Sequence, residues 1–241
     1  MYDLSVHCET CAFTFERVGV PNPSALPVSV LRGRLRRGLE SLDREVVEAY
    51  AEILPEGDYV VSLSDLRPKL VHPLDEDDYF ANEGRALFGT EAPFYDLPAT
   101  PRTPYYRADG ERTFNPVGKM WGYNTDEPWP QRAASFVFLA PMNSISSLDP
   151  NTLAEYRSSA GRGTAVALSV LDAKAPVVGF DADPDYEVDA HWCWTHYLLD
   201  GHHKTRATSL EGDSLSLLSF TALEEGVSTR ADVEQLIALL G

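Results

Sequence analysis

The chain is poor in positive charge. Its 241 residues include 20 Lys and Arg against 37 Asp and Glu, which gives a formal net charge of −17 at pH 7. Nucleic acids and acidic membrane surfaces are both negatively charged and select basic partners. The composition therefore argues against both as partners. The largest basic cluster, Arg32, Arg34, Arg36 and Arg37, is followed at once by acids in ESLDREVVEAYAE.

Long apolar runs are absent as well. No stretch of about 18 apolar residues exists, so no segment is expected to span a bilayer as a helix. The first residues, MYDLSVHCETC, lack the basic start and apolar core of a signal peptide. We therefore expect a cytoplasmic protein.

Cysteine is scarce, with three residues in the chain. Such scarcity fits a reducing compartment. Cys8 and Cys11 form a C-x2-C pair beside His7, but a structural zinc site normally needs a second pair of ligands, and Cys193 is far away in sequence. Free thiols near a first strand are favoured over a zinc site.

Several signatures of catalysis are missing. The chain contains neither G-x-x-x-x-G-K-[ST] nor G-x-S-x-G, and GRGTAV at Gly161 does not precede a predicted helix. The acidic stretch DADPDYEVD, residues 181–189, lacks the spacing of an EF-hand loop and is interpreted as a solvated loop. These absences exclude the commonest nucleotide, hydrolase and calcium motifs.

The chain can build a hydrophobic core, because 44% of its residues are hydrophobic. Periodicity predicts one or two helices over 29–54, a short helix within 147–163 and a closing helix over 228–241. Strands are predicted over 58–66, 134–142, 164–180 and 214–223. Strands and helices interleave, so we expect an α+β fold, a mixed sheet with packed helices.

We expect residues 1–241 to form one globular domain with three parts. Residues 1–90 are the N-terminal α/β part, and residues 131–241 carry the motif discussed next. Residues 91–130 hold seven prolines and many aromatics with little periodicity. Long irregular segments in compact proteins are often functional lids, so this part is predicted to be a packed cover over the site.

One stretch concentrates unusual residues. HWCWTHYLLDGHHKTRAT, residues 191–208, contains four of the six histidines and two of the four tryptophans. Its first part predicts a strand, in which Trp192, Trp194 and His196 share one face while Cys193 and Tyr197 share the other. The tryptophans are interpreted as core.

The second part predicts a turn followed by a helix. Asp200-Gly201 is a turn signal, HHKTRAT can begin a helix, and Gly212 can end it. The first amides of a helix carry partial positive charge and lack partners within the helix. Because Lys204 and Arg206 add full charges, the pattern predicts a phosphate site at this turn.

The segment LLDGHHKTRAT resembles the D-G-x-H-R motif of the ParB/sulfiredoxin-like superfamily. That family binds ATP, ADP or CTP at such a strand-to-helix turn, and it includes kinases that phosphorylate free serine. The resemblance covers about twelve residues closely and 164–225 loosely, and it implies a ParB/sulfiredoxin-like core in the C-terminal half. The first 130 residues resemble nothing in that family.

The resemblance implies particular roles. Asp200 matches the acid that serves as base in the serine-kinase branch, and His203 would be the second catalytic residue. The nucleotide phosphates would be held by the motif and the residues after it: Gly201, His202, His203, Lys204, Thr205 and Arg206. Mg²⁺ would bridge the phosphates, with Asp172 or an acid of a loop as the candidate protein ligand.

The sequence also departs from the family pattern. Lys204 stands where arginine is usual, which keeps the charge but loses the bidentate fork. The cysteine that sulfiredoxins use is absent, so sulfinic acid reduction is not implied. The glutamate that the kinase branch uses upstream has only Asp172, Glu187 and Asp189 as candidates here.

The leading hypothesis is thus an ATP- or ADP-dependent phosphotransferase acting on a small hydroxyl-bearing metabolite. A second hypothesis is a metal-dependent enzyme that uses the cluster His191–His203, for example through His196, Asp200 and His203, because histidine and carboxylate suit transition metals. A third is a nucleotide-binding switch protein without catalysis. The oligomeric state stays open.

Overall fold

The computed structural model describes residues 2–7, 12–17, 26–72, 105–108, 112–115, 133–158, 163–174, 191–223 and 228–240. The predicted C-x2-C pair, Cys8 and Cys11, and the acidic loop 181–189 lie outside these residues. Most of the predicted cover, residues 91–130, lies outside them too.

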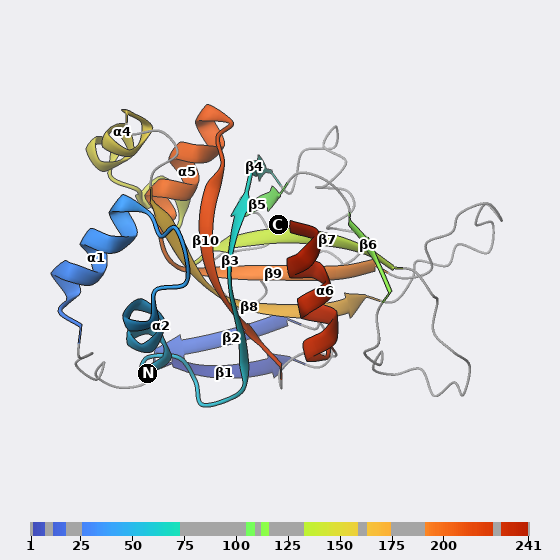
Figure 1. Cartoon of the computed structure of the whole chain (residues 1–241). Helices are drawn as coiled ribbons and strands as arrows, with labels where there is room; N and C mark the ends of the chain where they lie inside the picture. Colours follow the sequence, from blue (N-terminus) through green and yellow to red (C-terminus); the bar gives the residue numbers. More distant parts are fainter. Residues whose placement is uncertain are drawn as a thin grey trace, which may run out of the picture.

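The described residues form an α+β structure (Figure 1). Its helices are α1 (Val28–Arg37), α2 (Arg44–Ala51), α4 (Pro150–Ser158), α5 (His202–Glu211) and α6 (Arg230–Leu240), with a 3-10 turn, η2, at Ile145–Ser147. The strands are β1 (Tyr2–His7), β2 (Ala12–Arg17), β3 (Tyr59–Leu66), β4 (Pro68–Val71), β5 (Tyr105–Ala108), β6 (Arg112–Phe114), β7 (Ala133–Pro141), β8 (Thr164–Lys174), β9 (His191–Asp200) and β10 (Leu215–Ala222). The predicted fold class, α+β with a mixed sheet, is confirmed.

Eight of these strands form one sheet, and β1 and β2 form a separate antiparallel pair. The sheet order is β3-β10-β8-β9-β7-β5-β4, with β6 also paired to β7. The pairs β10/β8 and β7/β9 are parallel, and the other pairs are antiparallel. Strands from the first 90 residues and from the last 110 therefore share one sheet.

The sheet is strongly curled. β3 and β4 stand at opposite ends of the strand order, yet only Arg67 separates them in the chain. The two edges must therefore meet at Arg67, and in Figure 1 β3 and β10 cross in front of β7, β8 and β9.

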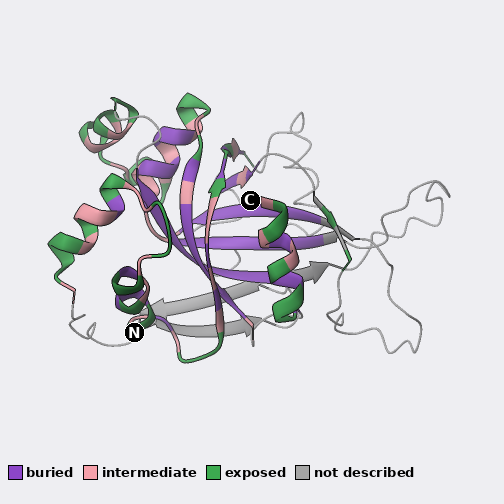
Figure 2. Ribbon diagram, viewed as in Figure 1, coloured by how far each residue is buried: buried purple, intermediate pink, exposed green. Residues whose placement is uncertain are grey.

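Both faces of the sheet are buried (Figure 2). One core cluster joins α1 and α2 to the face that carries Cys193 and Tyr197. The second joins α6 to the face that carries Trp192 and Trp194. The alternation predicted for the strand before the motif is thus confirmed, and the tryptophans are core.

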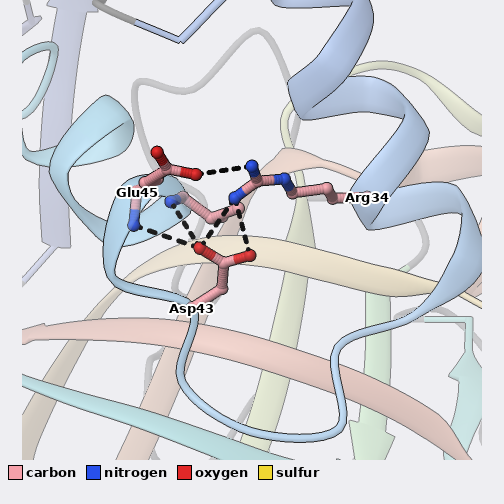
Figure 3. Close-up of polar contacts among 4 residues, drawn as sticks. Arg34, Asp43 and Glu45 are labelled. Atoms are coloured by element: carbon pink, nitrogen blue, oxygen red, sulfur yellow. Dashed lines mark hydrogen bonds and ion pairs between the residues drawn. The ribbon is translucent and has the colours of Figure 1, made fainter.

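A polar clamp joins α1 to α2. The Asp43 carboxylate caps α2 by accepting the N–H groups of Glu45 and Val46, at 3.1 and 3.3 Å. It also accepts two hydrogen bonds from the Arg34 guanidinium, which pairs with Glu45 as well (Figure 3). The clamp therefore connects the last turn of α1 to the start of α2.

Part of the predicted cover proved to be sheet. Tyr105–Ala108 and Arg112–Phe114 are the strands β5 and β6, and Tyr105 and Tyr106 are buried. Strands of four and three residues are too short to show a period of two, so the sequence pattern could not reveal them.

Candidate functional site at the junction of β9 and α5

The turn between β9 and α5 is built around Gly201. Its φ is +98°, in the left-handed region where glycine has no steric penalty. A Cβ atom placed there would lie 2.7 Å from the Cβ and 2.8 Å from the Cα of Ala165. Close packing against β8 and the backbone angle each require glycine. The predicted D-G turn is therefore confirmed, and these two constraints explain why glycine occupies it.

Asp200 is the last residue of β9, and it directly precedes Gly201 in this turn. Its side chain is 43% exposed, whereas that of Lys204, one turn into α5, is 5% exposed. The Lys204 ammonium donates to the carbonyl oxygen of Thr164 at 2.8 Å and to the Asp200 carboxylate at 3.4 Å. Burial lowers the pKa of Lys204, and the neighbouring Asp200 opposes that effect.

The two histidines of the motif are hydrogen-bond acceptors. The backbone N–H of Met142 donates to Nε2 of His202 at 3.0 Å, and the backbone N–H of Asp149 donates to Nε2 of His203 at 3.0 Å. A ring nitrogen that accepts cannot carry a proton, so each neutral ring must hold its proton on Nδ1. Each Nδ1–H is then a donor at the start of α5.

Thr205 and Arg206 play different parts. The Thr205 hydroxyl is buried and donates to the carbonyl oxygen of Gly201 at 3.1 Å, so it braces the turn. Arg206 is half-buried. Burial, the larger effect, raises the pKa of the Tyr106 phenol, while the charge of Arg206 acts to lower it.

Three residues outside the motif join the site. Arg36 at the end of α1 lies 5.6 Å from the ring centroid of Tyr156 on α4 and pairs with Glu155 at 3.0 Å. Burial raises the pKa of Tyr156, Arg36 acts to lower it and Asp200 acts to raise it. Thr164 links α1 to α5, because its Oγ1 accepts from the N–H of Leu39 and its carbonyl oxygen accepts from Lys204.

Sequence reasoning missed these partners for a clear reason. Arg36 belonged to a basic cluster noted for its charge alone, and Tyr156 sits in a short helix with no unusual pattern. Their positions near Asp200 follow from the packing of α4 against α5 and of α1 against β8. No local pattern encodes such packing.

Asp172, the candidate magnesium ligand, lies far from the motif. It pairs with Cys193, whereas Asp200 pairs with Val166, six residues earlier on β8. At about 3.3 Å per residue, roughly 20 Å separates the two backbone positions. A magnesium ion at the turn must therefore take its ligands elsewhere.

His196 is likewise separate from the motif. It is fully buried against the Trp194 ring, and its Nδ1 lies 2.6 Å from the Ser169 hydroxyl. Burial lowers its pKa to about 3. Four strand residues, roughly 13 Å, separate His196 from Asp200, so the two cannot ligate one ion. Across the described part of the chain, no three His, Cys, Asp or Glu side chains are grouped to hold a metal.

No family model, curated protein or solved structure matches the chain. Among the helices of the described residues, none combines the length and apolar character needed to cross a membrane.

Proposed function

We propose that the chain is a nucleotide-dependent phosphotransferase that acts on a small hydroxyl-bearing metabolite, with a ParB/sulfiredoxin-like core around β8, β9 and α5. The observation that carries this proposal is the partly exposed Asp200 carboxylate at a glycine turn, directly before the first amides of a ten-residue helix. This arrangement places a base candidate beside donors that suit phosphate oxygens.

In this proposal the phosphates bind at the start of α5. The first amides of the helix and the Nδ1–H groups of His202 and His203 are donors there, and they bind an anion without needing a charged imidazole. The third proton of the Lys204 ammonium remains for a phosphate oxygen after Thr164 and Asp200 have been satisfied. Arg36 adds a second cation from α1.

Asp200 would orient the acceptor hydroxyl and take its proton. A hydroxyl becomes a better nucleophile as its proton passes to a base within hydrogen-bond distance. The contact with Lys204 holds the carboxylate in place, and partial exposure leaves it accessible to a substrate. Mg²⁺, when bound, would neutralise charge on the transferring phosphoryl group, with ligands drawn mainly from phosphates and water.

Ligand-induced stabilisation provides the first test. ATP, ADP, CTP and GTP, each with and without Mg²⁺, are added to the wild type while thermal unfolding is followed. A ligand at 100 times its Kd stabilises the folded state by about 2.7 kcal/mol, which is readily measured. A shift specific to one nucleotide is expected, and no shift with any of them would contradict the proposal.

Three variants test the roles of Lys204 and Asp200. Lys204→Met should weaken the shift, whereas Lys69→Met, which removes one exposed lysine on β4, should leave it unchanged. Asp200→Asn should keep nucleotide binding while abolishing phosphoryl transfer to a panel of small hydroxyl compounds. Loss of nucleotide binding in Asp200→Asn, with the fold intact, would argue against the role given to this carboxylate.

A further inference from the structure

The segment between β7 and α4 is attached to the start of α5 by two matched hydrogen bonds. Met142 directly follows β7 and Asp149 directly precedes α4, and each donates its backbone N–H to one of the adjacent rings of His202 and His203. The intervening residues contain the 3-10 turn η2. Both ends of the connection are thus held by imidazoles.

These bonds exist only while the rings are neutral. Protonation converts Nε2 from an acceptor into a donor, which then points a proton at another donor. It also places positive charge at the first turn of α5, where the helix dipole disfavours cations. Both effects act in the same direction at both rings.

The surroundings of the two rings act in both directions. Burial lowers the pKa of His202, Asp200 acts to raise it, and His203 acts to lower it. Charged and titratable side chains near the rings come from the end of β9, from α5, from α4 with its cap, from β4 and from the last turn of α1: Asp200, Lys204, Arg206, Glu211, Asp149, Glu155, Tyr156, Arg157, Lys69 and Arg36. All four acids have partners: Asp200 binds Lys204, Glu155 binds Arg36, Glu211 binds Arg157, and Asp149 caps α4 at Thr152. The charge of His203 also acts to lower the pKa of Asp149.

We propose that His202 and His203 form an acid-sensitive latch, which holds the 142–149 segment against α5 at neutral pH and releases it when the rings are protonated. The two histidines are positioning residues in this role, since they act through the backbone they hold. The latch depends on the geometry alone. Any consequence of this release for the phosphate site at the same turn rests on the proposed function.

The sign of the effect follows from the neutral form. Because His202 has a lowered pKa in the folded state, its stabilising contribution is fully present above its unfolded value near 6.5 and is lost as the pH falls below that value. His196 also contributes a loss of stability as the pH falls, because burial lowers its pKa in the folded state. A comparison of variants must therefore separate the latch from His196.

Nitrogen-15 NMR of the full chain tests the latch directly. At pH 8 both rings are expected in the Nδ1–H tautomer. Once the pH is low enough for the ring signals to show protonation, the amide signals of Met142 and Asp149 should have moved with them, and the protection of these amides from exchange should have fallen by about tenfold, the loss of one hydrogen bond each. The amide of Thr205, bonded to the Gly201 carbonyl oxygen, is the internal control.

A conservative variant provides the second test. His202→Gln/His203→Gln offers an amide oxygen as acceptor and does not titrate, so the 142–149 amides should keep their protection at pH 5. Its unfolding free energy should fall less between pH 8 and 5 than that of the wild type. His72→Gln, which removes an exposed histidine elsewhere, should behave as the wild type does.

Three results would overturn the latch: an Nε2–H tautomer in either ring, Met142 and Asp149 amides that ignore ring titration, or equal pH dependence in the wild type and the Gln variant. All measurements use protein without nucleotide. Failure of the nucleotide panel would therefore leave the latch standing, and failure of the latch would leave nucleotide binding to be judged separately.

Discussion

At the scale of single residues, the candidate site depends most on the absence of a side chain at Gly201. Two separate costs oppose any other residue there. The left-handed backbone costs roughly 1–2 kcal/mol for a residue with a Cβ, and forcing atoms into a packed site costs typically 1–3 kcal/mol more. The contact of 2.7 Å with Ala165 supplies the second cost.

Gly201→Ala should therefore destabilise the protein more than Gly212→Ala. Gly212 also has positive φ, +69°, but a Cβ there meets nothing within 4 Å, so that variant carries only the backbone cost. Urea denaturation should give a loss of about 1 kcal/mol for Gly212→Ala and at least about 2 kcal/mol for Gly201→Ala. Equal losses would mean that β8 yields at Ala165 and that close packing does not shape the turn.

The motif shows how far sequence reasoning extends at this scale. The turn at Asp200-Gly201 and the helix after it could be predicted, because turn and cap preferences are local. The acceptor roles of His202 and His203 could not, since their donors at Met142 and Asp149 lie 60 and 54 residues away in the chain. The buried position of Lys204 depends equally on the distant Thr164.

At the scale of elements, α2 owes its start to one carboxylate. Asp43 satisfies two amides that the helix itself leaves without partners, and it binds Arg34 across the α1–α2 connection. Desolvation acts to raise the pKa of Asp43, but hydrogen bonds from the Val46 amide and Arg34 outweigh it and lower the pKa. The cap therefore works best in its ionised form.

Replacing Asp43 should separate its two functions. Asp43→Ala loses both the cap and the ion pair and should cost about 1–2 kcal/mol of unfolding free energy, while Asp43→Asn keeps a capping oxygen and should cost less. Because the folded pKa is lowered, the stabilisation by the ionised form is present above the unfolded value near 3.8 and is lost as pH falls through the folded value.

Urea titrations of the wild type and Asp43→Asn between pH 6 and 3 would measure this loss. The two curves should converge in acid, and the contribution of His196, common to both proteins, cancels in the difference. Curves that stay parallel would show that the charge of Asp43 adds nothing beyond its capping oxygen.

Most elements were predictable because their signals are local. The helices in 28–51, the strands β3, β7, β8 and β10 and the closing helix α6 lie where periodicity and caps place them. At the start of α6, the Thr229 hydroxyl accepts from the N–H of Asp232, as expected of an N-cap. β5 and β6 were missed because seven residues in two strands carry too little pattern.

At the scale of the whole molecule, the curl of the sheet was beyond sequence reasoning. The curl arises because β3 and β4 follow one another almost directly in the chain, while β3 pairs with β10 and β4 pairs with β5. Such curling depends on long-range pairing, and alternation along one strand says nothing about which strand lies next to it. The site depends on long-range packing as well, because α4 packs against α5 while α1 and α5 both pack against β8.

The excess of acidic residues acts on the same scale. A net charge of −17 repels itself in the folded state, and the repulsion is screened over about 30 Å at 0.01 M salt but over about 8 Å at 0.15 M. Raising NaCl across this range should therefore raise the thermal midpoint by a few degrees, as expected for about 1 kcal/mol in a chain of this size.

Neutralising exposed acids should have the same effect without salt. Glu40→Gln/Glu52→Gln/Glu56→Gln changes three exposed residues and takes the net charge from −17 to −14. Its midpoint at low salt should lie above that of the wild type, and its response to NaCl should be smaller. Surface ion pairs such as Arg36–Glu155 respond in the opposite direction, since salt weakens attraction between exposed charges. A wild-type midpoint that falls with NaCl would mean that the attraction within these ion pairs outweighs the global repulsion. The excess of acidic residues would then need an explanation other than an effect on stability.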